Sequence, residues 1–196
     1  MMTRLPRSFY QRPATEVAPD LLGKLLVHQT ELGLRIGRIV EVEAYLGRED
    51  LAAHSSKGLT KRTSVMFGEA GHAYVYLIYG MHHCMNVVTG PQGSGSAVLL
   101  RALEPMQGLQ LNTSGPGRLA KAMGIDKRFY GSDLCCATSA LFLADDGHSI
   151  DAILRSPRIG VHYAGEWVER PLRYYVADSK WVSRAPAVKA GSSPRK

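Results

Sequence analysis

The chain has 196 residues, of which 45% are hydrophobic and 21% charged, a composition that indicates a folded globular protein and excludes a disordered one. Its 24 Lys and Arg residues outnumber 17 Asp and Glu residues, and the net charge of +7 is compatible with a polyanionic partner without requiring one. Three cysteines, two of them adjacent, exclude a disulfide framework, and no apolar run reaches the length of a membrane span. We therefore expect a protein without a signal peptide or membrane partner, located in a bacterial cytoplasm (the nucleoid) or a eukaryotic nucleus.

The chain is predicted to begin with a short helix and a strand. Residues 15–22 form the helix, which Thr15 can cap and Gly23 can end. Residues 24–29 follow as a strand, and a glycine-containing turn leads to the next one.

The most informative strand is predicted at residues 34–46. Side chains alternate between two faces, so Glu43 and Tyr45 lie on the same face with Glu41 one step behind. A carboxylate beside an aromatic ring suits sugar–base chemistry, since the ring can stack on a base and the carboxylate can activate a water. From the strand alone, the simpler interpretation is that Glu41 and Glu43 are exposed on the solvated side of an edge strand.

A β-hairpin is predicted after a loop-rich segment at residues 47–70. Its strands are residues 73–78 and 83–88, and Tyr79 stands at the turn beside Gly80. Hairpin tips are normally polar, so a ring at this position is badly placed for a core but well placed to fill the gap left by an extruded nucleotide.

Two further features of the hairpin bear on binding. Tyr74 and Tyr76 share one face of the first strand, which ordinary β-propensity can also explain. Asn86 is a polar side chain in an apolar return strand, and its amide must pair with backbone or read a base edge.

The second half of the chain is predicted to hold one helix and several short strands. Residues 97–103 form a strand that Pro105 breaks. The segment Ser114-Gly115-Pro116-Gly117 opens a helix that runs to about Met123 and that Gly124 ends. Three more strands are expected at residues 141–144, 159–163 and 172–176. Strands mixed with short helices, without regular βαβ alternation, indicate an α+β fold with a largely antiparallel sheet. We expect one domain over residues 5–182, with flexible ends at residues 1–4 and 183–196.

Other chemistry is weakly represented in the sequence. The histidines and cysteines match no metal-site spacing, so we expect no metal and no cofactor. Two alternatives to sugar–base chemistry stay open at this point. One is a non-enzymatic nucleic-acid-binding module, and the other is a hydrolase that uses Cys135 or a His–Glu pair on a small molecule.

Several segments together resemble the alkyladenine (3-methyladenine) DNA glycosylase family. They are RIVEVEAYLGREDLAAHS, RTSVMFGEAGHAYVYLIYGMHHCMNVV, AVLLRALEP, SGPGRLAKAMGI and RIGVHYAGEW…PLRYYV, in family order from about residue 5 to residue 182. The resemblance implies a compact mixed α/β domain with a hairpin that protrudes into the DNA minor groove. It also implies a monomeric, cofactor-free base-excision-repair enzyme acting on double-stranded DNA. Its substrates would be 3-methyladenine, 7-methylguanine, hypoxanthine and ethenoadenine, and its product an abasic site.

The same resemblance implies a role for eight residues. Glu43 matches the general base, and Arg101 an active-site arginine near the water and the DNA backbone. Tyr45, His54 and Tyr76 match side chains around the flipped base, and Asn86 the side chain that rejects normal guanine. Tyr79 matches the intercalating residue at the hairpin tip, accompanied by Met81.

Overall fold

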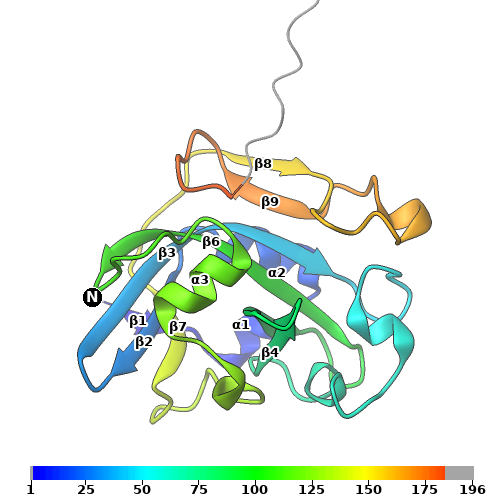
Figure 1. Ribbon diagram of the computed structural model, residues 1–196, viewed down its shortest axis with the longest axis horizontal. Helices are drawn as coiled ribbons and strands as arrows, with labels where there is room; N and C mark the ends of the chain where they lie inside the picture. The colour runs from blue at the N-terminus through cyan, green and yellow to red at the C-terminus, as the bar shows by residue number, and fades with distance from the viewer. Residues whose placement is uncertain (1, 184–196) are drawn as a thin grey trace, which may run out of the picture.

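Nine strands join in one antiparallel sheet in the computed structural model, which describes residues 2–183 (Figure 1). The strands are β1 (Thr3–Arg4), β2 (Leu25–Thr30), β3 (Gly33–Tyr45), β4 (Ala73–Ile78), β5 (His82–Thr89), β6 (Ser96–Gln107), β7 (Leu141–Asp145), β8 (Ile153–Ser156) and β9 (Arg173–Val176). The main order is β1-β7-β2-β3-β6-β5-β4, and β9 pairs with both β3 and β8. The α+β class and the single, largely antiparallel sheet are thus confirmed.

Three short helices cover the sheet. They are α1 (Arg7–Tyr10), α2 (Ala14–Leu21) and α3 (Pro116–Met123). Figure 1 shows α3 in front of the sheet and α1 and α2 behind it. Apolar residues of α2 and α3, such as Leu21 and Leu119, join one buried cluster with the sheet. Four 3-10 turns lie at His54–Lys57, Ser64–Phe67, Lys127–Phe129 and Gly165–Trp167.

Strand β3 is the centre of the sheet rather than an edge. Along its length it pairs with β2, with β6 and, at Glu41 to Glu43, with β9. Both of its faces are covered, and Glu41 and Glu43 each have 0% of their surface exposed. The interpretation of these two carboxylates as solvent-exposed is therefore wrong. β9 pairs alongside this part of β3 (Figure 1), and groups from β6, β9 and the loop after β8 bond the carboxylates, namely Arg101, Arg173 and Ile159.

The hairpin and the third helix lie where the sequence predicts them. β4 and β5 pair from Ala73↔Val87 to Ile78↔His82. Helix α3 begins at Pro116 and ends before Gly124, whose φ of 73° is left-handed. The fixed φ of proline suits the first turn of a helix, and glycine readily adopts the positive φ that ends one. These two preferences explain why the helix boundaries could be predicted from the sequence.

Three local predictions need correction, and one strand was missed. Helix α2 begins at Ala14 behind Pro13, so Thr15 does not cap it. Pro105 does not end β6, because a register shift opposite Gly37 accommodates it within the strand. Residues 159–163 form a loop rather than a strand, and the short strand β8 was not predicted.

The N-terminal end is also more ordered than expected. Thr3 and Arg4, within the segment predicted to be flexible, pair with β7 as strand β1. The Arg4 guanidinium donates to the carbonyls of Leu134, Ala137 and Ser139. At the other end, the Ser183 N–H donates to Glu41 at 2.7 Å. The prediction for residues 184–196 lies outside the described residues.

Candidate active site

A cavity of about 420 Å³ opens between the end of β3, the β4–β5 hairpin and the loop at residues 159–163. Its wall is mostly aromatic and apolar, with a few polar side chains. The lining residues are Tyr45, Ala52, His54, Met66, Tyr74, Tyr76, Ile78, Tyr79, Cys84, Asn86, Leu99, Arg101, Pro116, Ile159, Gly160, Val161 and Tyr163. An apolar concave site with few convergent polar groups is typical of a small-molecule or base pocket.

The Glu43 carboxylate lies directly behind this wall, held by three neighbours. Its Oε2 accepts a hydrogen bond from the Tyr45 hydroxyl at 2.9 Å. Its Oε1 accepts the Ile159 N–H at 2.7 Å, and Arg101 Nη1 lies 3.3 Å from the same oxygen. The carboxylate is thus buried, ion-paired and adjacent to groups that face the cavity.

Glu41, the next acid on this face, forms a second buried ion cluster with Arg101. Its Oε1 accepts from Arg101 Nε at 2.8 Å and from Arg173 Nε at 2.7 Å. Its Oε2 accepts the Ser183 N–H. Burial opposes ionisation, but the charge of Arg101 and the Ser183 N–H outweigh it and lower the pKa of Glu41. Glu41 therefore stays charged and fixes the guanidinium that contacts Glu43.

Aromatic side chains from separate segments meet in the cavity wall. Tyr74 and Tyr76 lie on one face of β4 with ring centroids 5.4 Å apart. The His54 ring packs edge-on against Tyr76 at 4.6 Å, and its Nδ1 lies 2.8 Å from the Tyr74 hydroxyl. Burial, and secondarily the charge of Arg62, lowers the pKa of His54 to about 4, so the imidazole is neutral at pH 7.

The tyrosine hydroxyls in this wall stay protonated. Burial raises the pKa of Tyr45 well above its ordinary value, and the nearby Glu43 charge adds to the effect. Burial likewise raises the pKa of Tyr76, and the Cys84 thiol adds to the effect. Both phenols therefore keep a proton to donate at physiological pH.

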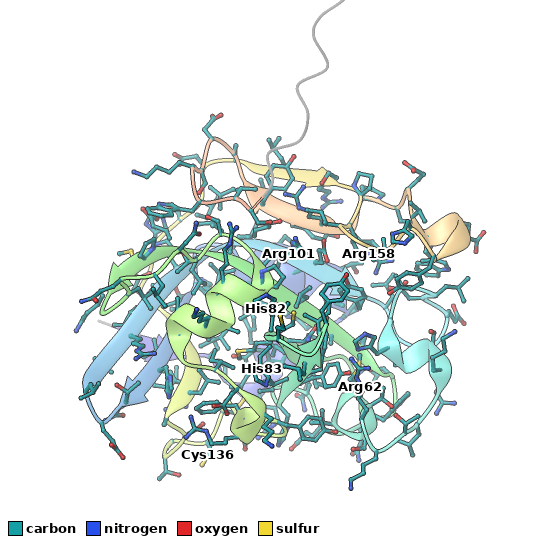
Figure 2. The ribbon with its side chains drawn as sticks, in the orientation of Figure 1. Arg62, His82, His83, Arg101, Cys136 and Arg158 are labelled. Atoms are coloured by element: carbon teal, nitrogen blue, oxygen red, sulfur yellow. The ribbon has the colours of Figure 1, made fainter. Side chains whose placement is uncertain are left out.

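A buried ion pair anchors the loop that closes the cavity. Arg158 and Asp50 have side chains that are 0% exposed, and both guanidinium Nη atoms donate to the carboxylate. Arg158 also donates to the Ala44 carbonyl, and its Cζ lies 4.7 Å from the centroid of the Tyr45 ring. Figure 2 shows Arg101 and Arg158 on the side of the sheet that faces the β8–β9 ribbon. The ion pair thereby fixes the orientation of the Tyr45 ring and the position of the Ile159 N–H.

The hairpin tip combines exposure with backbone strain. Tyr79 is 84% exposed and has φ of 52°, a left-handed conformation that is unusual for a residue other than glycine. Gly80 follows with φ of 69°, and Met81 is 72% exposed. Two large apolar side chains are held in solvent by a turn of fixed geometry, which favours a binding role.

Asn86 lies in the cavity wall with its amide only partly engaged. The residue is 5% exposed, and its Nδ2 donates to the Tyr74 carbonyl at 3.1 Å. That bond fixes the direction of the amide plane from the neighbouring strand β4. A buried amide held in this way can oppose a substituent on a ligand edge.

Of the eight residues singled out from the sequence, six line the cavity: Tyr45, His54, Tyr76, Tyr79, Asn86 and Arg101. Glu43 lies behind them, and Met81 stands outside on the tip. Sequence reasoning missed the contributions of Ile159, Arg158 and Asp50. No local pattern marks them, because the Arg158–Asp50 contact joins residues 108 positions apart.

The other candidate chemistry is less well supported. Cys135 is half-buried, burial raises the pKa of its thiol, and it does not line the cavity. Within residues 2–183, no cluster of three or more His, Cys, Asp or Glu side chains could hold a metal ion, and no helix has the length and apolar character of a membrane span. A larger hollow of about 720 Å³ near β1 is lined by Arg12, Asp20 and Asp146, whose charges are already ion-paired.

Comparison with known proteins gives consistent similarities. A sequence model described as methylpurine-DNA glycosylase matches residues 8–180. A Legionella pneumophila (strain Corby) protein is 57% identical over 184 residues, which cover 93% of this chain and 100% of the relative. A Myxococcus xanthus (strain DK1622) protein is 55% identical over 189 residues, covering 94% and 96%. Both relatives carry the name "Putative 3-methyladenine DNA glycosylase".

Proposed function

The chain belongs to the methylpurine-DNA glycosylase family and is a DNA glycosylase of DNA repair, and on this basis we propose that it excises flipped-out alkylated or deaminated purines with Glu43 as the base that activates water. The substrates would be 3-methyladenine, 7-methylguanine, hypoxanthine and ethenoadenine in double-stranded DNA. The observation that carries the proposal is a buried, ion-paired carboxylate directly behind an aromatic cavity.

A flipped base would be bound by the aromatic wall. Tyr45 and Tyr76 would contact its faces, and each base–aromatic stack is worth roughly 1–3 kcal/mol. The neutral imidazole of His54 would meet the base edge. A cationic alkylpurine gains further from the electron-rich faces of the rings. The volume of about 420 Å³ is sufficient for one purine with its sugar.

Selection against normal guanine would fall to Asn86. Its amide is held by the Tyr74 carbonyl and is 5% exposed, so it cannot swing away freely. A 2-amino group facing this amide would meet a rigid obstacle, whereas adenine-like and hypoxanthine rings carry no such group. 7-Methylguanine does carry it, and its excision would depend on its positive ring charge, which strengthens stacking on the aromatic wall and makes the base a better leaving group. The rigidity of the amide supports this role.

Flipping itself would use the hairpin tip. Tyr79 is exposed and also borders the cavity, so its ring can fill the space of a nucleotide that has moved into the site. Met81 would contact the duplex beside it. An adjoining hollow contains His82, Arg101 and Arg118, basic groups suited to the DNA backbone. We expect the chain to act as a monomer, because one copy carries every group in this scheme.

The chemical step is a hydrolysis at the sugar C1′. Glu43 accepts a proton from water, the water oxygen bonds to C1′, and the C1′–N bond breaks. The bonding electron pair leaves with the purine. A cationic base such as 3-methyladenine or 7-methylguanine departs as a neutral molecule, and Glu43 returns its proton to solvent. Hypoxanthine and ethenoadenine are neutral in DNA, so they depart as anions and take up one proton, which balances the proton that water gave to Glu43. Arg101 holds the carboxylate, and the carboxylate supports positive charge that develops at the sugar. The products are a free base and an abasic site, and the step uses no group from outside the chain except water.

The test is Glu43→Gln on duplexes that contain 3-methyladenine, hypoxanthine or ethenoadenine. The neutral amide keeps the size of the side chain but cannot accept a proton, so damaged-DNA binding is retained while single-turnover excision falls by at least ~10³-fold. Glu31→Gln is the matched control, since Glu31 is exposed in the turn before β3, at the far end of the strand from Tyr45. Excision at the wild-type rate by Glu43→Gln would remove Glu43 as the base.

A further inference from the structure

We propose that the Tyr45 hydroxyl positions the Glu43 carboxylate for catalysis, so that Tyr45 serves the hydrolytic step as well as the stacking of the base. The inference rests on the proposed function, in which Glu43 activates water. It concerns a single hydroxyl group, and the ring that would stack on the base is unchanged by its removal.

The contacts of Glu43 leave one acceptor position of its carboxylate unoccupied. A carboxylate offers about four acceptor positions on its two oxygens. Oε1 is engaged by the Ile159 N–H at 2.7 Å and by Arg101 Nη1 at 3.3 Å. Oε2 receives one hydrogen bond from the described part of the chain, that of the Tyr45 hydroxyl at 2.9 Å. The remaining acceptor position is therefore on Oε2, beside the phenol, and this is where a water would bind.

The phenol is a donor in a fixed direction. Burial and the neighbouring carboxylate raise the pKa of Tyr45, so the phenol keeps its proton at physiological pH. A hydroxyl that donates its one proton still has lone pairs that can accept from the same water. The water would then be held by Oε2 and the Tyr45 oxygen together.

The backbone and an arginine keep this phenol in place. Residues two apart on a strand point to the same face, so the Tyr45 hydroxyl reaches the carboxylate without distortion. The Arg158 guanidinium lies 4.7 Å from the centroid of the ring and is itself fixed by Asp50. Ring rotation away from Glu43 would break a cation–π contact in a buried position.

Tyr130 provides a matched control outside the cavity. It is half-buried like Tyr45 and is not among the residues that line the cavity. Its hydroxyl is hydrogen-bonded to neutral groups, the Ser64 hydroxyl at 2.9 Å and the carbonyls of Lys61 and Arg62 at 3.2 Å. A Tyr→Phe change therefore removes a hydroxyl in both cases, and only at position 45 does it remove a donor to Glu43.

The experiment compares Tyr45→Phe with Tyr130→Phe in the full chain. Loss of a hydrogen bond to a charged group predicts a fall of about 10- to 100-fold in the single-turnover excision rate for Tyr45→Phe, with lesion-DNA Kd within about 3-fold of wild type. Tyr130→Phe should change the rate by less than about 3-fold, because its hydroxyl bonds neutral groups away from the cavity.

A double-mutant cycle with Glu43→Gln separates positioning from packing. If the hydroxyl acts through the carboxylate, Tyr45→Phe has little further effect on the residual rate of Glu43→Gln. A purely structural effect would instead appear equally in both backgrounds, including any loss of stability. Tyr45→Phe with the wild-type rate, or with equal losses in both backgrounds, overturns this inference while Glu43→Gln remains inactive. Failure of the proposed function is a different result, namely wild-type excision by Glu43→Gln itself.

Discussion

Replacing Arg158 with methionine tests whether the buried ion pair holds the loop over the cavity. Methionine retains much of the aliphatic length but supplies no donor to Asp50 or to the Ala44 carbonyl. Asp50 would keep its hydrogen bonds from the N–H groups of Leu46 and Ala52, both at 3.0 Å, and lose its counter-ion. The change thus leaves an unpaired carboxylate in a place with 0% exposure.

The expected cost is large for a single substitution. Removal of one partner from a fully buried ion pair costs about 3–5 kcal/mol, because the other charge stays desolvated. That is a large share of the roughly 5–15 kcal/mol by which a domain of this kind is stable. In a domain of 150–250 residues each kcal/mol moves Tm by about 2–4 °C, so Arg158→Met should lower Tm by roughly 6–20 °C.

Urea unfolding followed by far-UV circular dichroism measures the effect directly. The control is Arg128→Met, since Arg128 also pairs with an aspartate, Asp126 at 2.9 Å, but its side chain is 77% exposed. Exposed pairs contribute little, so the control should change the free energy of unfolding by less than about 1 kcal/mol. Adding Asp50→Asn to Arg158→Met should recover part of the loss, because the amide oxygen still accepts a backbone N–H. A cost for Arg158→Met no greater than for Arg128→Met would refute the reasoning.

Three further predictions concern His54, Tyr79 and Arg118. Burial and Arg62 lower the pKa of His54 to about 4 from about 6.5 in the unfolded chain, so the unfolded state binds more protons and stability is lost as pH falls from about 6.5 to 4. His54→Gln should lose less stability over this window in urea titrations, and equal slopes would contradict the assignment. Tyr79→Asn keeps a residue that tolerates left-handed φ, so the urea midpoint should stay equal or rise, while excision from duplex DNA falls at least ~10-fold and excision from single strands does not. Equal losses on both substrates would argue against a wedge. Arg118 is exposed in the hollow beside the cavity, and Arg118→Gln should reduce the slope of log K for DNA against log salt by about 1. An unchanged slope would show that this arginine meets no phosphate.

The parts of the fold that sequence predicts well are those set by local chemistry. The β4–β5 hairpin follows from alternating apolar residues around Gly80, whose φ of 69° suits glycine. The bounds of α3 follow from Pro116 and Gly124, which favour a helix start and a helix end. The pairing of Glu43 with Tyr45 on one face follows from the two-residue period of a strand.

The burial of the acids in β3 could not be predicted in this way. Strand period places Glu41 and Glu43 on one face, but does not say what covers that face. The partners come from far along the chain, since Arg101 and Arg173 are 60 and 132 residues from Glu41. Without those arginines, two carboxylates would have a lower free energy in solvent than in the interior, so the sequence alone predicts an exposed face.

The loop at residues 159–163 was misread for a related reason. Its β-branched residues, Ile159 and Val161, have strand propensity and gave the prediction of a strand. In the structure the preceding Arg158 is fixed to Asp50, and the Ile159 N–H donates to Glu43 rather than to a strand partner. A tertiary hydrogen bond to a side chain thus replaces the ladder that propensity favours, and this is also why Ile159 was missed as a site residue.

The three buried acids in and after β3 differ in how fully they are satisfied, and this difference supports Glu43 as the reactive one. Asp50 accepts two hydrogen bonds on each oxygen, which fills the capacity of a carboxylate. Glu41 accepts four, three on Oε1 and one on Oε2, and is ion-paired with both Arg101 and Arg173. Glu43 accepts two from the described residues and has one longer contact with Arg101. Asp50 thus has no position left for a water, and Glu41 is held by two arginines, whereas Glu43 is the least satisfied of the three. A buried carboxylate with an open acceptor position costs free energy unless something occupies it, and next to a cavity that occupant is solvent or substrate. The same network therefore stabilises two acids as anchors and leaves the third able to act on water.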